Sequence, residues 1–326
     1  MSKLRPNMLQ HFELVSDSEL FSDTILGITS QWDSLITLKL KNSGDFLLDV
    51  LAKQTPPPKL QYLAFHEYGM IDCDTERTDI DELELIQRNQ LFFEQSQLSF
   101  GQWIGSCRSL RRLEVCLATA NPSLLASALE SQDISLEALT ILEESPESEV
   151  RFQDSDQFYK ALASHSSLQE LTILAAVGRK TNLLLEAVQK LANLRVLHID
   201  KATNQLKPHK VGTLTSSLPH LKELSICNSK LDDQLWDQLY VPQLRYLKLG
   251  TQRKIRRGYT HHFTGEGIIN WVHGLGPANQ GLRLEIQAPY IESTLKPEEC
   301  QAVEKELVQC VGGSFRSWRM ESIPGA

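Results

Sequence analysis

The sequence lacks the long hydrophobic runs of a membrane protein. No stretch of eighteen apolar residues occurs in the 326 residues, and the first ten, MSKLRPNMLQ, lack the apolar core of a secretory signal peptide. The six cysteines form no CxxC pair and no dense framework. We therefore expect no membrane association, reduced thiols and an intracellular location, in the cytoplasm or the nucleus.

The sequence also lacks an excess of positive charge. The 33 lysines and arginines are outnumbered by 41 aspartates and glutamates, which gives a net charge of −8. A chain of this charge gains no general attraction to the phosphates of nucleic acid, so only a local basic patch could bind them. We expect protein partners rather than nucleic acid.

Catalytic and metal-binding motifs are missing as well. The chain contains no G-x-S-x-G, no P-loop and no H-E-x-x-H. The adjacent His261 and His262 have no cysteine or histidine at a ligand-like spacing. The sequence therefore predicts a protein that is not an enzyme and that has neither a cofactor nor a metal site.

What the sequence does contain is a repeated phrase, L-x-x-L-x-(L/I/V/F), which alternates apolar and polar residues as a half-buried strand does. Most successive copies start 23 to 27 residues apart, the spacing of a stacked repeat. Eight full copies and one shorter one occur: LITLKL from Leu35, LQYLAF from Leu60, LRRLEV from Leu110, LEALTI from Leu136, LQELTI from Leu168, LRVLHI from Leu194, LKELSI from Leu221, LRYLKL from Leu244 and LRLEI from Leu282.

Between the phrases, apolar residues take helical spacing, as in PSLLASALES (122–131) and NLLLEAVQKLA (182–192). One strand and one helix in about 26 residues cannot bury their own apolar faces, whereas stacked copies can. We therefore predict an α/β solenoid whose parallel strands line the inside of an arc and whose helices lie outside.

These repeats resemble the leucine-rich repeat superfamily, specifically the ribonuclease-inhibitor-like type with a helix in every repeat. The best copies are LKELSICNSKLDDQLWDQL (221–239) and FTGEGIINWV (263–272). The resemblance implies a horseshoe with a concave parallel sheet and convex helices, similar to the repeat arrays of fungal F-box/leucine-rich-repeat proteins. It covers about nine strands.

Three regions are expected along the chain. Residues 1–34 are predicted to be a helical N-terminal cap, residues 35–290 the irregular repeats, and residues 291–326 a capping helix with a tail. In that helix, Cys300, Val303, Leu307, Cys310 and Val311 are expected to form one apolar stripe that covers the last repeat.

The polar positions of the phrases predict where a partner binds, because they point away from the leucine core. Tyrosine and arginine at such positions are typical anchors of protein interfaces. The candidates on the concave face are Tyr62, His66, Arg112, Glu114, Glu170, His198, Asp200, Glu223, Tyr246 and Lys248. A basic inserted loop adds Arg253, Lys254, Arg256, Arg257 and Tyr259.

We therefore expect a protein-interaction module that binds a polypeptide through this sheet face and its loops. The resemblance extends this to F-box-like substrate recognition in a ubiquitin-ligase adaptor complex, although residues 1–34 show no F-box pattern. Two alternatives stay open: a regulator of a small GTPase, for which Arg253, Arg256 or Arg257 could supply a catalytic arginine, and a structural repeat scaffold without a dedicated ligand.

Overall fold

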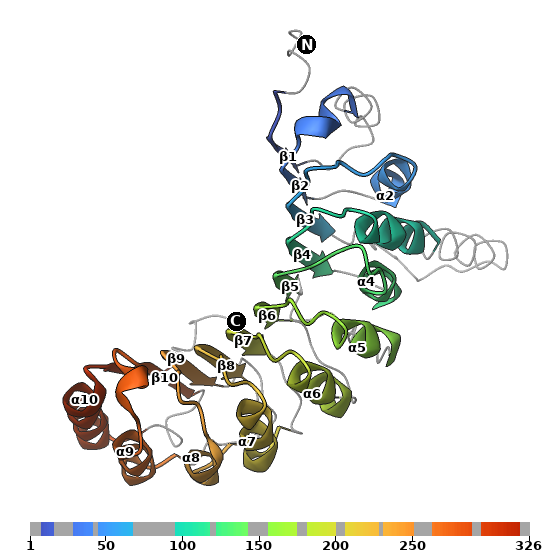
Figure 1. The fold of residues 1–326 in the computed structure, drawn as a ribbon. Coiled ribbons are helices and arrows are strands. Elements are labelled where there is room, and N and C mark those ends of the chain that lie inside the picture. Colours follow the sequence, from blue (N-terminus) through green and yellow to red (C-terminus); the bar gives the residue numbers. More distant parts are fainter. Residues whose placement is uncertain are drawn as a thin grey trace, which may run out of the picture. The chain divides into compact units, whose positions relative to one another are not determined.

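The protein divides into two compact units, Met1–Ser167 and Leu168–Ala326, each of which is built from parallel strands and helices. Figure 1 shows the computed structural model. It describes residues 8–15, 29–41, 45–67, 95–117, 122–142, 156–174, 181–199, 206–227, 231–250, 263–288 and 295–319.

In the first unit, five parallel strands pair in the order in which they occur in the chain. They are β1 (His11–Val15), β2 (Thr37–Lys41), β3 (Tyr62–Glu67), β4 (Arg112–Leu117) and β5 (Ala138–Leu142). The described helices lie on one side of these strands (Figure 1). They are the 3-10 helix η1 (Thr29–Ser34), α2 (Asp45–Ala52), the helical residues 95–105, α4 (Pro122–Leu129) and α5 (Asp156–Leu162).

The second unit repeats this arrangement with six parallel strands, again in chain order. The strands are β6 (Glu170–Ile173), β7 (Val196–Ile199), β8 (Glu223–Cys227), β9 (Tyr246–Gly250), β10 (Arg283–Ala288) and β11 (Ser314–Arg319). The helices are α6 (Thr181–Gln189), α7 (Pro208–Ser216), α8 (Gln234–Gln238), α9 (Gly265–His273), the 3-10 helix η2 (Pro277–Asn279) and α10 (Pro297–Val311).

The leucines of the repeated phrase form the core of each unit. The leading leucines, such as Leu60 in the first unit and Leu194 in the second, are fully buried, and so are the second leucines, such as Leu63 and Leu197. Because a parallel strand alternates its side chains between two faces, these leucines lie between the strands and the helices. The predicted α/β repeat solenoid is therefore confirmed.

Backbone hydrogen bonds fix how each strand starts against the previous one. In repeat after repeat, one carbonyl accepts from two consecutive N–H groups of the next repeat, as Gln61 does from Arg111 and Arg112, each at 2.9 Å. Both lone pairs of the carbonyl are thus used. The same pattern recurs at the carbonyls of Gln10, Ile36, Arg111, Gln169, Arg195 and Lys222.

Side chains in the turns satisfy further carbonyls of the preceding repeat. In the first unit, the serine before a leading leucine donates this bond: Ser34 to Leu9 at 2.8 Å, Ser109 to Pro58 at 2.6 Å and Ser167 to Leu136 at 2.8 Å. In the second unit, the buried Asn279 amide donates to two carbonyls, those of Val241 and Leu244. Neighbouring repeats are therefore joined by polar contacts as well as by leucines.

The structure corrects the prediction at both ends of the array. Eleven strands occur among the described residues rather than nine. The two additional strands, β1 and β11, were not predicted because they carry no full leucine phrase. Within 1–34, His11–Val15 is a strand rather than part of a helical cap, because it pairs in register with β2. After α10, Gly312 adopts a positive φ of 61° and turns the chain into β11.

The predicted stripe of α10 is only partly confirmed. Val303, Leu307 and Val311 are buried as expected, whereas Cys300 is half-buried and Cys310 is exposed. Among the described helices, α10 is the longest with 15 residues, and none has the length and apolar character needed to cross a bilayer.

We expect Leu197→Ala to lower the free energy of unfolding by about 2–5 kcal/mol, because the change leaves a cavity in a fully buried layer of the second unit. The midpoint of urea unfolding, followed by circular dichroism, measures this loss. Val308→Ala is the matched control, since Val308 is 52% exposed and should change stability by no more than ~0.5 kcal/mol. Equal midpoints for both variants would contradict the assigned core.

Candidate functional site

The strand face that points away from the helices carries the predicted partner-binding residues, and we call it the open sheet face. Buried and partly exposed residues alternate along the strands, as in β2 and β7. In the first unit, this face carries Tyr62, His66, Arg112 and Glu114. In the second unit, the open sheet face carries Glu170, His198, Glu223, Tyr246 and Lys248. Asp200 and the loop residues Arg253, Lys254, Arg256, Arg257 and Tyr259 fall outside the described residues.

In the first unit, Glu114 collects two hydrogen bonds from the neighbouring strand β3. The Tyr62 hydroxyl donates to Oε2 at 2.8 Å, and Nε2 of His66 lies 2.8 Å from Oε1. The Lys39 ammonium lies 5.6 Å from the centre of the Tyr62 ring, within cation–π range. This group of side chains, with Arg112 beside it, is the first-unit cluster.

In the second unit, Glu285 takes the same place. The Tyr246 hydroxyl donates to its Oε2 at 3.1 Å, and the Arg283 guanidinium pairs with its Oε1. The Arg283 guanidinium also lies 5.7 Å from the centre of the Tyr246 ring. The His198 ring meets the other side of this group edge-to-face, with its centroid 6.4 Å from that of Tyr246. We call these four residues the second-unit cluster.

The two clusters share one construction. A tyrosine stands on one strand, and the sequence Arg-Leu-Glu follows on the next strand, with the arginine directly opposite the tyrosine. Tyr62 faces Arg112 and bonds Glu114, whereas Tyr246 faces Arg283 and bonds Glu285. Sequence reasoning missed Arg283 and Glu285, although the Arg-Leu-Glu shared by LRRLEV and LRLEI was a visible signal.

The surroundings keep both tyrosine hydroxyls protonated. Partial burial, followed by the hydrogen bond and charge of Glu114, raises the pKa of Tyr62 to about 12. Burial, with the charge and hydrogen bond of Glu285, likewise raises the pKa of Tyr246 to about 12. At neutral pH both groups are therefore hydrogen-bond donors rather than bases, and both rings are held in place by a carboxylate.

His198 is kept neutral by its position. Burial lowers its pKa, and the carboxylate of Glu223 opposes this effect only in part. The His198 Nε2 atom lies 3.9 Å from Oε2 of Glu223, too far for a hydrogen bond. The ring thus contributes an aromatic surface beside Tyr246 at neutral pH.

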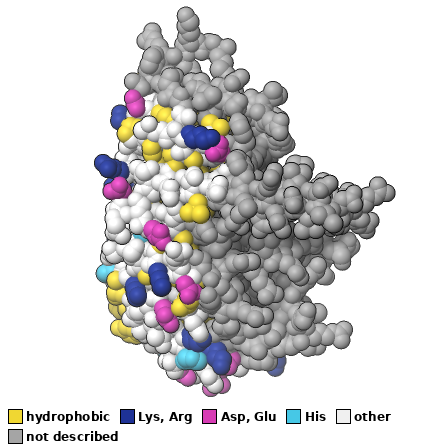
Figure 2. Space-filling model, turned by 90° about the vertical axis from the view of Figure 1, so that its right-hand side faces the viewer, with side chains coloured by type: hydrophobic (Ala, Val, Ile, Leu, Met, Phe, Trp, Pro, Cys, Tyr) yellow, Lys and Arg dark blue, Asp and Glu magenta, His cyan; other side chains and the backbone are white. Residues whose placement is uncertain are grey.

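Charges of both signs are mixed on one face of the molecule. Figure 2 shows lysine and arginine side chains lying near aspartate and glutamate side chains, with hydrophobic side chains between them.

Comparison with known proteins shows no family for this chain. No protein-family model matches the sequence, and no curated protein matches it. Among solved structures, the chain is similar to a Bacteroides fragilis protein determined by a structural genomics consortium. That similarity has a TM-score of 0.47 at 12% identity, over 95% of this chain and 75% of the other.

We expect Glu114→Gln to lower the pKa of Tyr62 from about 12 while leaving it above 10.0, because the anionic acceptor is lost and the burial remains. Because folding raises the pKa of Tyr62, its protonated hydroxyl contributes to the stability of the folded protein. This contribution is fully present below pH 10 and is lost as the pH rises through 12. The variant should therefore lose less stability over this interval than the wild type.

Phenolate absorbance during an alkaline titration measures this shift, and urea midpoints over the same pH range measure the stability. Glu130→Gln, at an exposed position directly after α4, is the control. Tyr246 serves as an internal reference, since its partner Glu285 is unchanged. Superimposable titration curves for Glu114→Gln and the wild type would contradict the assigned bond.

Proposed function

We propose that the protein is a non-enzymatic interaction module that binds a polypeptide through its open sheet faces. The observation that carries the proposal is the repeated Tyr–Arg–Glu cluster, present once in each unit. Neither cluster is needed for the leucine core, because it lies on the opposite side of the strands.

The side chains of these clusters have the chemistry of interface anchors. Tyrosine and arginine contribute most to many protein interfaces, because they combine apolar area with directed hydrogen bonds. Here the rings of Tyr62 and Tyr246 are already fixed by Glu114 and Glu285. A partner would therefore bind them without ordering them first, which lowers the entropic cost of association.

The size of the sheet constrains the binding mode. Five strands about 4.8 Å apart and five residues long cover only about 300 Å². A stable interface buries about 800 Å² on each partner, so one unit's strands supply less than half of it. The proposal therefore includes the strand-to-helix loops, among them the basic residues 251–262, which favour an acidic segment in the partner.

The finer version of the proposal makes the bound polypeptide a substrate for ubiquitination. It depends on the resemblance of the repeats to F-box/leucine-rich-repeat arrays, not on the geometry of the clusters. Recovery of a cullin–adaptor complex with the protein would support this version. Binding of other polypeptides without that complex would support the general version alone.

We expect the charge reversals Arg112→Glu and Arg283→Glu, made together, to reduce partner capture roughly tenfold or more, because both arginines belong to the clusters. Affinity purification from native cells with mass spectrometry identifies the partner. Titration of the purified partner against each variant then gives the affinity.

Lys160→Glu and Lys305→Glu, made together, form the matched control. They reverse the same number of charges at exposed positions on α5 and α10, one in each unit. The control should bind as the wild type does, and both double variants should keep the wild-type circular-dichroism melt. Equal capture by the two double variants would exclude the open sheet faces as the binding surface.

A further inference from the structure

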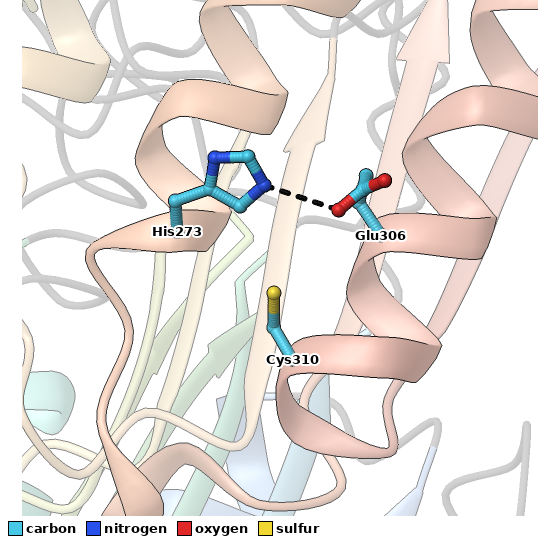
Figure 3. A group of neighbouring side chains, drawn as sticks. All are labelled: His273, Glu306 and Cys310. Carbon is cyan, nitrogen blue, oxygen red and sulfur yellow. Dashed lines mark hydrogen bonds and ion pairs between the residues drawn. The ribbon is translucent and has the colours of Figure 1, made fainter.

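Three side chains of different chemistry meet at the ends of two packed helices in the second unit. His273 is the last residue of α9, and Glu306 and Cys310 lie on α10 (Figure 3). The group is compact, since one ligand atom from each residue lies within 4.8 Å of those of the other two. Nε2 of His273 is 3.0 Å from Oε2 of Glu306.

The fold brings these residues together for identifiable reasons. Glu306 and Cys310 are four residues apart, so they lie on the same face of α10. α9 and α10 pack side by side, and Gly274 caps α9 directly after His273. Both His273 and Cys310 stand in the last turn of their helices, where the partial negative charge of the backbone favours a cation.

The leucine core does not require this set of side chains. Cys310 is exposed, and the side chains of His273 and Glu306 are 53% and 28% exposed. The buried residues of α10 are Val303, Leu307 and Val311, on another face of the helix. The three polar groups therefore remain accessible to an ion from solution.

The donor set matches zinc better than the other common divalent ions. Zinc binds thiolate, imidazole and carboxylate together, whereas magnesium and calcium prefer oxygen ligands alone. Tetrahedral zinc places its ligand atoms about 3.3–3.6 Å apart, given bond lengths of about 2.0–2.3 Å. The three ligand atoms lie within 4.8 Å of one another. Side-chain rotations that move these atoms by about 1 Å would bring them to the spacing of zinc ligands.

We propose that His273, Glu306 and Cys310 form a zinc site with three protein ligands, the fourth position being taken by water. The ion links the end of α9 to α10 and replaces the hydrogen bond between His273 and Glu306. The cysteine binds as the thiolate, so its proton is released to solvent on zinc binding. This site is independent of the open sheet faces.

The test is titration of the reduced, untagged full-length chain with ZnCl₂ by isothermal calorimetry, together with the absorbance of the Co²⁺-loaded protein. We expect one zinc per chain and a thiolate-to-cobalt charge-transfer band. His273→Ala, Glu306→Gln and Cys310→Ser should each raise the Kd for zinc by about tenfold or more, and Cys310→Ser should abolish the charge-transfer band.

The controls separate this site from other histidines and cysteines. Cys300→Ser changes a half-buried cysteine on the same helix, and the double variant His261→Ala/His262→Ala removes the adjacent histidine pair. Both should bind zinc as the wild type does. The proposal is overturned if the wild type shows no saturable binding, or if the three ligand variants, folded by circular dichroism, retain wild-type affinity.

Discussion

The structure depends on the fact that one strand–helix repeat cannot bury its leucines alone. Each leucine layer is completed by the repeat beside it, and the carbonyl that accepts two N–H groups fixes the two repeats in one register. A shift of one residue would turn the leucines to the open face and the polar residues into the core. The register is therefore set by burial and by backbone hydrogen bonding at the same time.

This register determines which polar side chains can meet. Paired strands are aligned residue by residue, so a tyrosine at the first position of a strand that faces the open side stands opposite the arginine at the same position of the next strand. The next residue of that strand that faces the open side lies two positions further along. The hydroxyl reaches that second position, where the carboxylate of Glu114 or Glu285 accepts a hydrogen bond from it. The clusters are thus a consequence of the repeat geometry applied to particular side chains.

The sequence predicted the elements that follow the leucine phrase and missed those that do not. The strands from β2 to β10 were expected because they carry the leucine phrase, whereas β1 has Phe12 in place of the second leucine and β11 has no leading leucine. The candidate residues Tyr62, Glu114 and Tyr246 were found from their open positions. Their hydrogen bonds, the role of Glu285 and the grouping of His273 with Cys310 depend on contacts between repeats, which a single repeat does not encode.

The two clusters differ in what they leave accessible to an approaching molecule. The Glu285 side chain is 2% exposed and the Arg283 side chain is 54% exposed, so the second unit presents positive charge outward while its negative charge is enclosed. In the first unit, the Glu114 side chain is 27% exposed, so its negative charge stays within reach. The Tyr–Arg–Glu motif thus encloses its carboxylate in the second unit and leaves it partly exposed in the first.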